Sequence, residues 1–222
     1  KERSPLFGGL CKAMSKRKAP YNVVEPNELE KLCGSIHHQG VVAMIDEPKI
    51  IPIDTKILND IITRNEHTIL LDRVGNANNL GAIVRSAAFF GIKNIVIPND
   101  EAQSSITTSS YRVAEGGMEF VNIYCTDSIL KLLKSVEGKM VRIGTDLSAR
   151  KTVGEIQSLC REKPALIILG NEESGISEAV RKNCDELVII PFYGIKSGKA
   201  SPVDSLNVAQ AASIILYELL KK

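Results

Sequence analysis

The sequence contains no tryptophan, few other aromatic residues and no long hydrophobic run. Aromatic residues make up only 5% of the 222 positions. The apolar stretches at 165–170 and 187–192 are far shorter than the roughly 20 residues that a membrane span needs, and the basic N-terminus has no apolar signal core. With 44% apolar and 24% charged residues, the composition is still that of a folded protein. We therefore expect a soluble, cytoplasmic chain without a membrane partner.

Paired cysteines are also missing. The five cysteines are scattered, their number is odd, and no C-x-x-C spacing occurs. This pattern is typical of reduced thiols and indicates neither a disulfide framework nor a zinc site. His37 and His38 have no partners at metal-binding spacing, so we predict no metal site.

The chain has almost no net charge, but the charge is unevenly distributed. The overall value of +2 argues by itself against a nucleic-acid partner, because phosphates select strongly basic surfaces. Residues 1–20, however, hold six Lys or Arg and one Glu, a net charge of +5, so the remaining residues carry −3. The basic stretch fits a solvated helix face and an RNA-contacting surface equally well.

Short apolar runs rich in β-branched residues alternate with helical stretches beyond about residue 66. Six such runs stand at 68–72, 94–98, 121–125, 140–144, 165–169 and 187–191. Continuous apolar strands that alternate with helices are typical of a parallel sheet with helices on both faces. The sequence therefore predicts an α/β fold.

Two helices are indicated by their apolar positions. A helix over roughly 205–220 is apolar nearly all round, so it must be buried inside the fold or against a second subunit. We therefore predict a homodimer. The earlier helix, between the first two strands, ends at Gly91 and has an apolar face made of Leu80, Ile83, Val84, Ala87 and Ala88.

Residues 1–46 do not join this alternation. The segments 21–34 and 41–45 predict a strand–helix–strand piece, and residues 47–65 form a linker and lead-in helix to a larger domain at 66–222. Forty-six residues are too few for a comfortable independent core. We therefore expect residues 1–46 to be part of a small domain that extends further upstream.

The loop at residues 72–85 follows the first strand, at the edge of a parallel sheet where ligands bind. It resembles a dinucleotide-binding turn only in part, because Ala77 and Leu80 stand where G-x-G-x-x-G needs glycine. No phosphate-binding P-loop motif is present either. A Rossmann oxidoreductase is therefore the alternative from another enzyme class.

Several residues of this first loop are candidates for a site. We expect Asn78 and Asn79 to cap the following helix, and Gly81 to permit close approach of a backbone or a ligand. Arg85 lies off the apolar face of that helix. An arginine at such a position is ordinarily just exposed to solvent. Because Asn79 and Gly81 lie nearby on the ligand side of the sheet, we regard Arg85 as a candidate functional residue.

Two later loops carry similar polar residues. Glu172 directly follows a Gly-Asn turn after an apolar strand, and Ser205 and Asn207 stand at the start of the last helix. Each of these residues could serve only as part of a turn or a cap. Because all three loops place acids, amides or hydroxyls at one sheet edge, we predict a site there.

Three segments carry a family resemblance. They resemble motifs one, two and three of the SpoU-like (TrmH-like) 2′-O-ribose methyltransferases of the SPOUT superfamily, and they lie at 79–87, at 166–177, and at 189–191 continuing through 205–218. The order and spacing of these motifs agree with the family pattern from about residue 66 to 220. Residues 37–45 are similar to the end of a small, ribosomal-protein-like substrate-binding domain found in many members.

The resemblance implies a C-terminal deep trefoil knot that binds S-adenosylmethionine, a homodimer, and tRNA or rRNA as substrate. Residues 1–46 would be part of the small α/β substrate-binding domain, and residues 66–222 the catalytic domain. The positions that match the family's catalytic residues are Asn79, Arg85, Glu172, Ser205 and Asn207. The positions that would line the cofactor pocket are Gly144, Thr145, Gly170, Asn171, Ile190, Pro191 and Leu206.

The implied reaction is the displacement of the sulfonium methyl group by a ribose 2′-oxygen. The family mechanism makes Arg85 the base, but a guanidinium ordinarily stays protonated. We expect Arg85 to anchor a neighbouring phosphate and stabilise developing oxyanion charge, with a share in deprotonation left open. Asn79 and Glu172 would orient Arg85 and the substrate, and Ser205 and Asn207 would shape the site.

The chain departs from the family pattern in two places. The stretch between Pro191 and Ser205 is several residues longer than usual and includes Lys196 and Lys199, and Glu115 stands where many members carry serine.

A catalytically silent RNA-binding relative is the main alternative function, and a scaffold protein is a weaker one. The presence of all five polar site residues favours an enzyme, while the RNA and the methylated nucleotide stay open.

Overall fold

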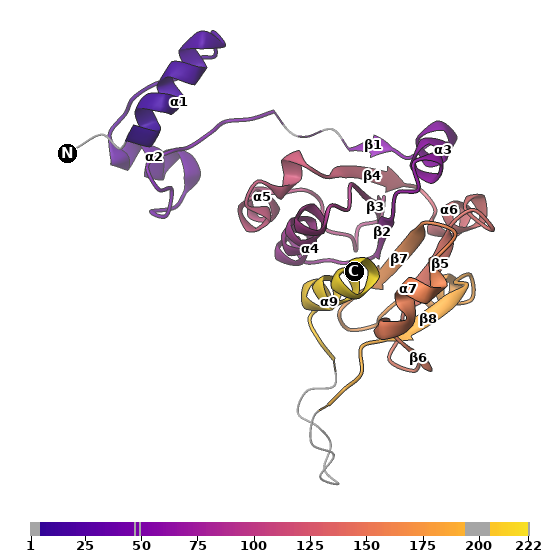
Figure 1. Cartoon of the computed structure of the whole chain (residues 1–222). Helices are drawn as coiled ribbons and strands as arrows, with labels where there is room; N and C mark the ends of the chain where they lie inside the picture. The colour runs from indigo at the N-terminus through magenta and orange to yellow at the C-terminus, as the bar shows by residue number, and fades with distance from the viewer. Residues whose placement is uncertain (1–4, 47, 49, 194–204, 222) are drawn as a thin grey trace. The chain divides into compact units, whose positions relative to one another are not determined.

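A computed structural model describes residues 5–46, 48, 50–193 and 205–221 (Figure 1). The chain divides into two compact units, Lys1–Glu47 and Pro48–Lys222. Within the described residues, no helix is long and apolar enough to cross a membrane.

The first unit contains two helices, α1 (Pro5–Lys16) and α2 (Pro26–Cys33). Helix α2 begins with a proline, and it ends at Gly34, whose positive φ of 64° is accessible to glycine at little cost. The strands predicted on either side of α2 do not form, so that prediction is wrong. The side chains of Val23 and Met44, 71% and 87% exposed, have no sheet face to pack on, and an isolated pair of strands is marginal in water.

The second unit is built on one sheet of eight strands in the order β1-β4-β3-β2-β7-β5-β8-β6, and every described pair is parallel. The predicted α/β class is confirmed, and all six predicted runs form strands. Strands β1 and β6 were missed because each has two residues, too few for a periodic signal. The strands are β1 (Ile51–Pro52), β2 (Thr68–Asp72), β3 (Asn94–Pro98), β4 (Asn122–Thr126), β5 (Val141–Thr145), β6 (Lys151–Thr152), β7 (Ala165–Gly170) and β8 (Glu186–Ile189).

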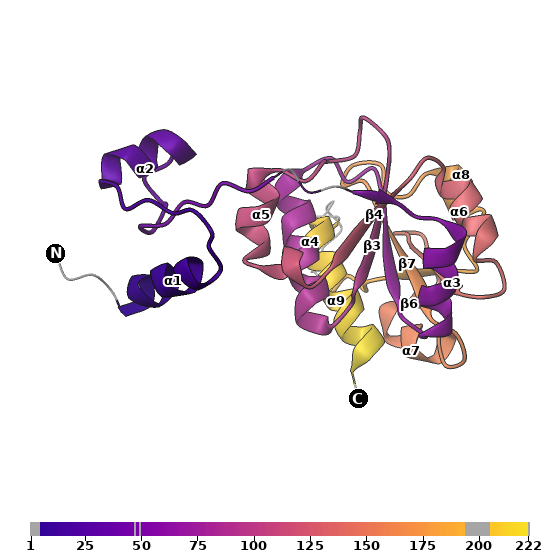
Figure 2. The same ribbon diagram turned by 90° about the horizontal axis from the view of Figure 1, so that it is seen from above.

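Helices cover both faces of this sheet, as Figure 2 shows. One face packs against α4, α5 and α9 and the other against α3, α6 and α8, which gives two separate hydrophobic clusters. The bounds are α3 (Thr55–Thr63), α4 (Ala77–Phe90), α5 (Thr108–Ala114), α6 (Ile129–Ser135), α7 (Ile156–Leu159), α8 (Glu178–Arg181) and α9 (Val208–Leu220), with 3₁₀ turns η1 (Gly117–Glu119) and η2 (Val153–Glu155).

The start of α4 differs from its prediction in one respect. The side chain of Asn76 caps the helix by accepting a 2.8 Å hydrogen bond from the amide of Asn78, so the expected caps Asn78 and Asn79 were wrong. The far end agrees, since Gly91 closes α4 with a φ of 76°. Because Asn76 takes the capping role, the side chain of Asn79 is available for a contact outside the helix.

Gly81 lets α4 and α5 approach closely. A Cβ atom at Gly81 would lie 2.4 Å from the carbonyl oxygen of Ser110, which is shorter than any tolerable contact. We predict that Gly81→Ala lowers the free energy of unfolding by about 2–3 kcal/mol, because the backbone of α5 must move. Denaturant unfolding measures this, with Gly154→Ala as the control, since its Cβ would meet no atom closer than 3.6 Å. Equal stability of both variants would contradict the packing argument.

A partly buried ion pair joins β5 to the residue before β8. The guanidinium of Arg142, 8% exposed, donates to both carboxylate oxygens of Asp185 at 2.6 and 3.0 Å. This hydrogen bonding holds the pKa of Asp185 below its ordinary value and raises the pKa of Arg142. The pair therefore stabilises the fold only while Asp185 is ionised.

We predict that Asp185→Asn destabilises the fold by about 2 kcal/mol at neutral pH, because Arg142 loses the carboxylate that accepts the two shortest hydrogen bonds of its guanidinium and keeps a longer contact of 3.4 Å with Glu137. The depressed pKa means that the contribution of Asp185 is complete above the ordinary aspartate pKa of about 3.9 and is lost as pH falls through the folded-state value. Thermal unfolding from pH 7 down to pH 3 should therefore show a gap between wild type and variant that narrows in acid. A gap that stays constant with pH would contradict this assignment.

Candidate active site

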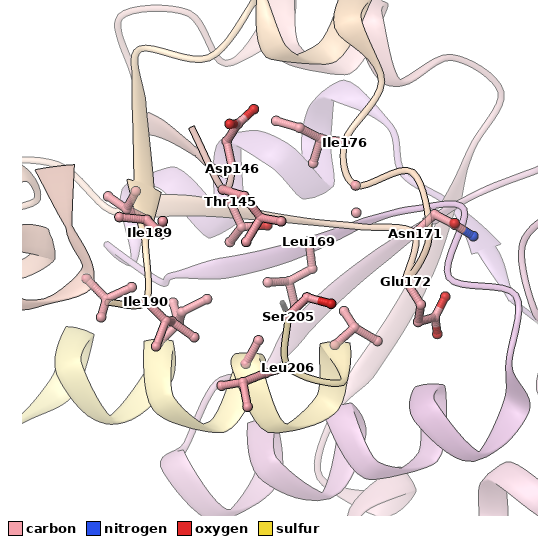
Figure 3. Close-up of a pocket in the computed structure, with 18 of the residues that line it drawn as sticks. Thr145, Asp146, Leu169, Asn171, Glu172, Ile176, Ile189, Ile190, Ser205 and Leu206 are labelled. Atoms are coloured by element: carbon pink, nitrogen blue, oxygen red, sulfur yellow. The ribbon is translucent and has the colours of Figure 1, made fainter. Parts of the chain in front are cut away.

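A cavity of about 680 Å³ lies at the carboxyl edge of the sheet, beyond β5, β7 and β8. Figure 3 shows Asn171 and Glu172 toward one end of it and Ile189 and Ile190 toward the other. Two of the three loops singled out in the sequence contribute to its lining, whereas the first loop, residues 72–85, contributes no residue to it. Its lining includes Thr145, Asp146, Leu169, Gly170, Asn171, Glu172, Ile176, Val188, Ile190, Pro191, Ser205, Leu206 and Ile215.

Six of the seven predicted cofactor positions line this cavity, and Gly144 does not. Gly144 is buried in β5, where a Cβ atom would lie 2.8 Å from both the sulfur of Cys184 and the Cδ1 of Ile176. Its place is therefore in the packing behind the cavity wall. Burial also raises the pKa of the Cys184 thiol to about 12, so this neighbour stays protonated and unreactive.

The loop after β7 is locked into a tight turn that forms one wall. Asn171 and Gly175 exchange two backbone hydrogen bonds of 3.0 and 2.8 Å, and Gly175 has a φ of 66°. A Cβ atom on Gly170 would lie 2.1 Å from the carbonyl carbon of Gly175, so only glycine fits there. The side-chain oxygen of Asn171 accepts hydrogen bonds from the amides of Glu173 and Ser174. The turn therefore presents its backbone to the cavity in one fixed shape.

Asp72, which sequence reasoning missed, anchors this turn to the neighbouring loop. Its carboxylate is buried at the end of β2 and accepts hydrogen bonds from the amide of Ser177 at 2.7 Å and from Arg73 at 3.0 Å. The side chain of Asn171 donates to the carbonyl oxygen of Arg73 at 3.0 Å. An acid that ends an otherwise apolar buried strand was the signal that could have identified Asp72.

Three predicted catalytic positions form a continuous chain of hydrogen bonds beside the cavity. The amide nitrogen of the Asn207 side chain donates to the side-chain oxygen of Asn79 at 3.0 Å. The Asn79 side chain in turn donates to the carboxylate of Glu172. Asn207 also caps α9, since its side-chain oxygen accepts from the amide of Ala209 at 2.9 Å. Asn207 is therefore a helix cap that also contacts Asn79, and its role in a site stays a prediction.

The remaining two catalytic positions differ in location. Ser205 lines the cavity beside Leu206. Arg85 lies on the exposed side of α4, outside the cavity lining, and its guanidinium pairs with Glu115 at 2.9 Å. The structure thus joins Asn79, Glu172 and Asn207 by hydrogen bonds, places Ser205 in the cavity lining, and leaves Arg85 on the surface of α4.

The cavity combines apolar walls with carboxylates at its rim. Leu169, Val188 and Ile215 supply buried apolar surface, which suits a flat aromatic ring. Glu172 supplies negative charge, which suits a cationic group, whereas the carboxylate of Asp146 already has a cationic partner. Asp146 is held by an ion pair with Arg181 at 3.2 Å and was also missed by sequence reasoning. The apolar walls and the carboxylate at the rim therefore suit a ligand that joins an aromatic base to a positively charged group.

Family models describe two parts of the chain. Residues 66–217 match the SpoU rRNA Methylase family, and residues 1–51 match the RNA 2′-O ribose methyltransferase substrate binding family. The first match covers more than half of the chain and includes the three motif segments as far as residue 217.

Relatives of known name are similar over most of the chain. The 23S rRNA (guanosine-2′-O-)-methyltransferase RlmB of Acinetobacter baylyi is 31% identical over 200 residues, which are 88% of this chain and 76% of that protein. An uncharacterized tRNA/rRNA methyltransferase of Haemophilus influenzae is 29% identical over 97% of this chain, but the match spans only 57% of that relative. The chain thus covers little more than half the length of some relatives.

Solved structures share the fold of the second unit. The SpoU methyltransferase AviRb from Streptomyces viridochromogenes, in complex with the cofactor AdoMet, is 29% identical with a TM-score of 0.60, over 71% of this chain and 60% of that one. A putative RNA methyltransferase of the TrmH family from Porphyromonas gingivalis is 26% identical with a TM-score of 0.61, over 69% and 59%. The resemblance carried by the three motifs is confirmed: the chain belongs to the SpoU rRNA methylase family.

Proposed function

We propose that this chain methylates the 2′-oxygen of a ribose in tRNA or rRNA, with S-adenosylmethionine as the methyl donor. The observation that carries the proposal is the hydrogen-bonded chain from Asn207 through Asn79 to Glu172, which joins the three family motifs and ends at a residue that lines the cavity. The name of the RlmB relative, a guanosine 2′-O-methyltransferase, supports the same reaction.

The cavity residues are suited to hold this cofactor. Leu169, Val188 and Ile215 would contact the adenine ring, and the backbone of the Gly170 turn would supply polar groups. Among the predicted positions, Thr145, Asn171, Ile190, Pro191 and Leu206 line the same cavity. When bound, S-adenosylmethionine supplies a methyl group that is already activated by its positive sulfur.

The residues around the cavity then have mainly a positioning task. Glu172 and Asn79 orient the attacking ribose, because their hydrogen bond fixes both side chains before substrate arrives. Arg85 binds the phosphate next to that ribose and stabilises negative charge that develops on the 2′-oxygen. Ser205 and Asn207 complete the rim at the start of α9.

We further propose a homodimer in which a C-terminal knot forms part of the cofactor site. Exposed apolar side chains on the packed helices α4 and α9 support an interface: Phe89 is 83% exposed, Tyr217 is 55% exposed and Ile214 is 36% exposed. The longer stretch at 192–204 extends beyond the described residues, and Lys196 and Lys199 lie outside them. Two observations support the proposed knot: the chain belongs to the SpoU family, and helix α9 packs against β7 and α4.

Residues 1–46 are proposed as part of an RNA-binding domain joined by residues 47–65 to the catalytic domain at 66–222. The match of residues 1–51 to a substrate-binding family supports this division. The net charge of +5 in residues 1–20 suits phosphate contact. The cytoplasmic location stays a prediction.

Incubation with methyl-labelled S-adenosylmethionine and separate tRNA and rRNA pools tests the proposal. We expect label in one of the two pools, and mapping of 2′-O-methyl sites to assign it to defined nucleotides. Binding of the cofactor measured by calorimetry serves as the second readout. Absence of cofactor binding together with absence of label in both pools would favour the catalytically silent RNA-binding relative and contradict the proposed function.

A further inference from the structure

The ion pair between Arg85 and Glu115 joins a predicted catalytic position to a residue outside the three motifs. Its Nη2–Oε2 distance is 2.9 Å, and the two side chains are 56% and 61% exposed. Exposed ion pairs contribute little to stability, because water screens them and two flexible side chains lose freedom. Stability of the fold therefore gives no sufficient reason for the pair.

The backbone around Glu115 is unusual for a residue that has a Cβ atom. Glu115 ends α5 with a φ of 44° and a ψ of 50°, in the left-handed region that glycine or asparagine occupies most easily. Gly116 follows with a φ of 86°. A strained conformation retained at the edge of a site is a recognised sign of a functional constraint.

The same turn lies directly against the backbone of α4. A Cβ atom on Gly117 would lie 3.2 Å from the Cα of Arg85 and 3.3 Å from the carbonyl oxygen of Val84. The absence of a side chain at Gly117 therefore lets the turn approach α4 at the position of Arg85. The approach brings the Glu115 carboxylate to the guanidinium.

An unpaired arginine on a helix surface samples many rotamers, and this freedom is lost when the guanidinium must bind a phosphate. A carboxylate that already holds one edge restricts that freedom before the substrate arrives. The guanidinium carries five N–H donors, so the edge that faces away from Glu115 stays available for a phosphate. Glu115 can thus orient Arg85 without competing for all of its donors.

We propose that Glu115 is a positioning residue that orients Arg85 for the phosphate next to the methylated ribose. This inference rests on the proposed function and extends it to a residue that none of the three motifs contains. The carboxylate acts through Arg85 and makes no contact with the reacting atoms. Loss of this carboxylate should therefore lower the turnover rate more than the affinity for the cofactor.

The test compares Glu115→Gln with wild type in methyl transfer to the RNA pool that accepts label. The glutamine keeps the size of the side chain but loses the charge that holds the guanidinium. We expect kcat to fall about three- to fivefold and KM for RNA to rise by no more than the same factor, with Kd for S-adenosylmethionine within about twofold of wild type. Glu119→Gln, an exposed carboxylate in the same segment, is the matched control and should retain wild-type kcat.

A double-mutant cycle separates positioning from a general effect on the fold. In an Arg85→Ala background, measured with excess enzyme and labelled cofactor, Glu115→Gln should cause no further loss. Glu115→Gly, which relieves the left-handed strain, should keep or raise the midpoint of thermal unfolding while kcat falls. Activity and stability would then change independently.

Three results would overturn the inference: wild-type kcat in Glu115→Gln, tighter RNA binding in that variant, or an equal loss in the Arg85→Ala background. Tighter binding would identify Glu115 as a competitor of the phosphate. If wild type itself transfers no methyl group to any RNA, the proposed function fails instead. The two failures are thus distinguishable in one set of assays.

Discussion

Replacing Arg85 by alanine should lower methyl transfer by about 10²- to 10³-fold, while the affinity for S-adenosylmethionine stays unchanged. The loss is large because the guanidinium is expected to act on charge that develops only as the 2′-oxygen attacks, and a preorganised donor of this kind contributes about 3–4 kcal/mol. The unchanged cofactor affinity follows from geometry, since Arg85 lies outside the cavity lining. Turnover assays and calorimetry measure the two quantities separately.

Two comparison variants sharpen this result. Arg85→Lys keeps the positive charge but loses the planar pair of donors, so we expect an intermediate rate. Arg161→Ala removes an exposed arginine before the amino end of β7, on the opposite edge of the sheet, and should leave the rate unchanged. Unchanged turnover in Arg85→Ala would remove Arg85 from the site.

Replacing Gly170 by alanine should abolish cofactor binding. The added Cβ atom would lie 2.1 Å from the carbonyl carbon of Gly175 and 2.2 Å from the amide of Ile176, and both are backbone atoms. No rotamer change relieves such a clash, so the turn that forms one cavity wall must rebuild. We expect at least a 100-fold weaker affinity for S-adenosylmethionine and about 3 kcal/mol lower stability.

Calorimetric titration and denaturant unfolding measure the two effects of Gly170→Ala. Gly154→Ala is again the matched control, because its Cβ would meet no atom closer than 3.6 Å. A Gly170→Ala variant that binds the cofactor as wild type does would show that the turn is no part of the binding site. Loss of binding with full stability would place the defect in the cavity wall alone.

The sheet was predictable because its strands are buried on both faces. A continuous apolar run such as Ala165–Gly170 is fully buried and leaves a signal that local sequence reading detects. The same reasoning failed at residues 21–25 and 41–45, because whether a short apolar run forms a strand depends on a partner strand elsewhere in the chain.

The site was predictable as a region, since parallel strands bring their following loops to one edge. Individual contacts were not, because they join residues far apart in the chain. The link between Asn79 and Glu172 spans 93 positions, and the anchor of Ser177 on Asp72 spans 105. The ion pair of Arg85 with Glu115 is a similar case, since helical periodicity placed Arg85 on the exposed side but gave no sign of its partner.

The double role of Asn207 has a thermodynamic consequence. One side chain caps the first turn of α9 through the amide of Ala209 and also donates a hydrogen bond to the side chain of Asn79 at the candidate site. A displacement of the first turn of α9 therefore changes the energy of the Asn79 contact, and binding at the active site must by reciprocity bias the position of that turn. Assembly of α9 with another surface and occupancy of the active site would then be linked equilibria, and protein concentration would shift the apparent affinity for substrate.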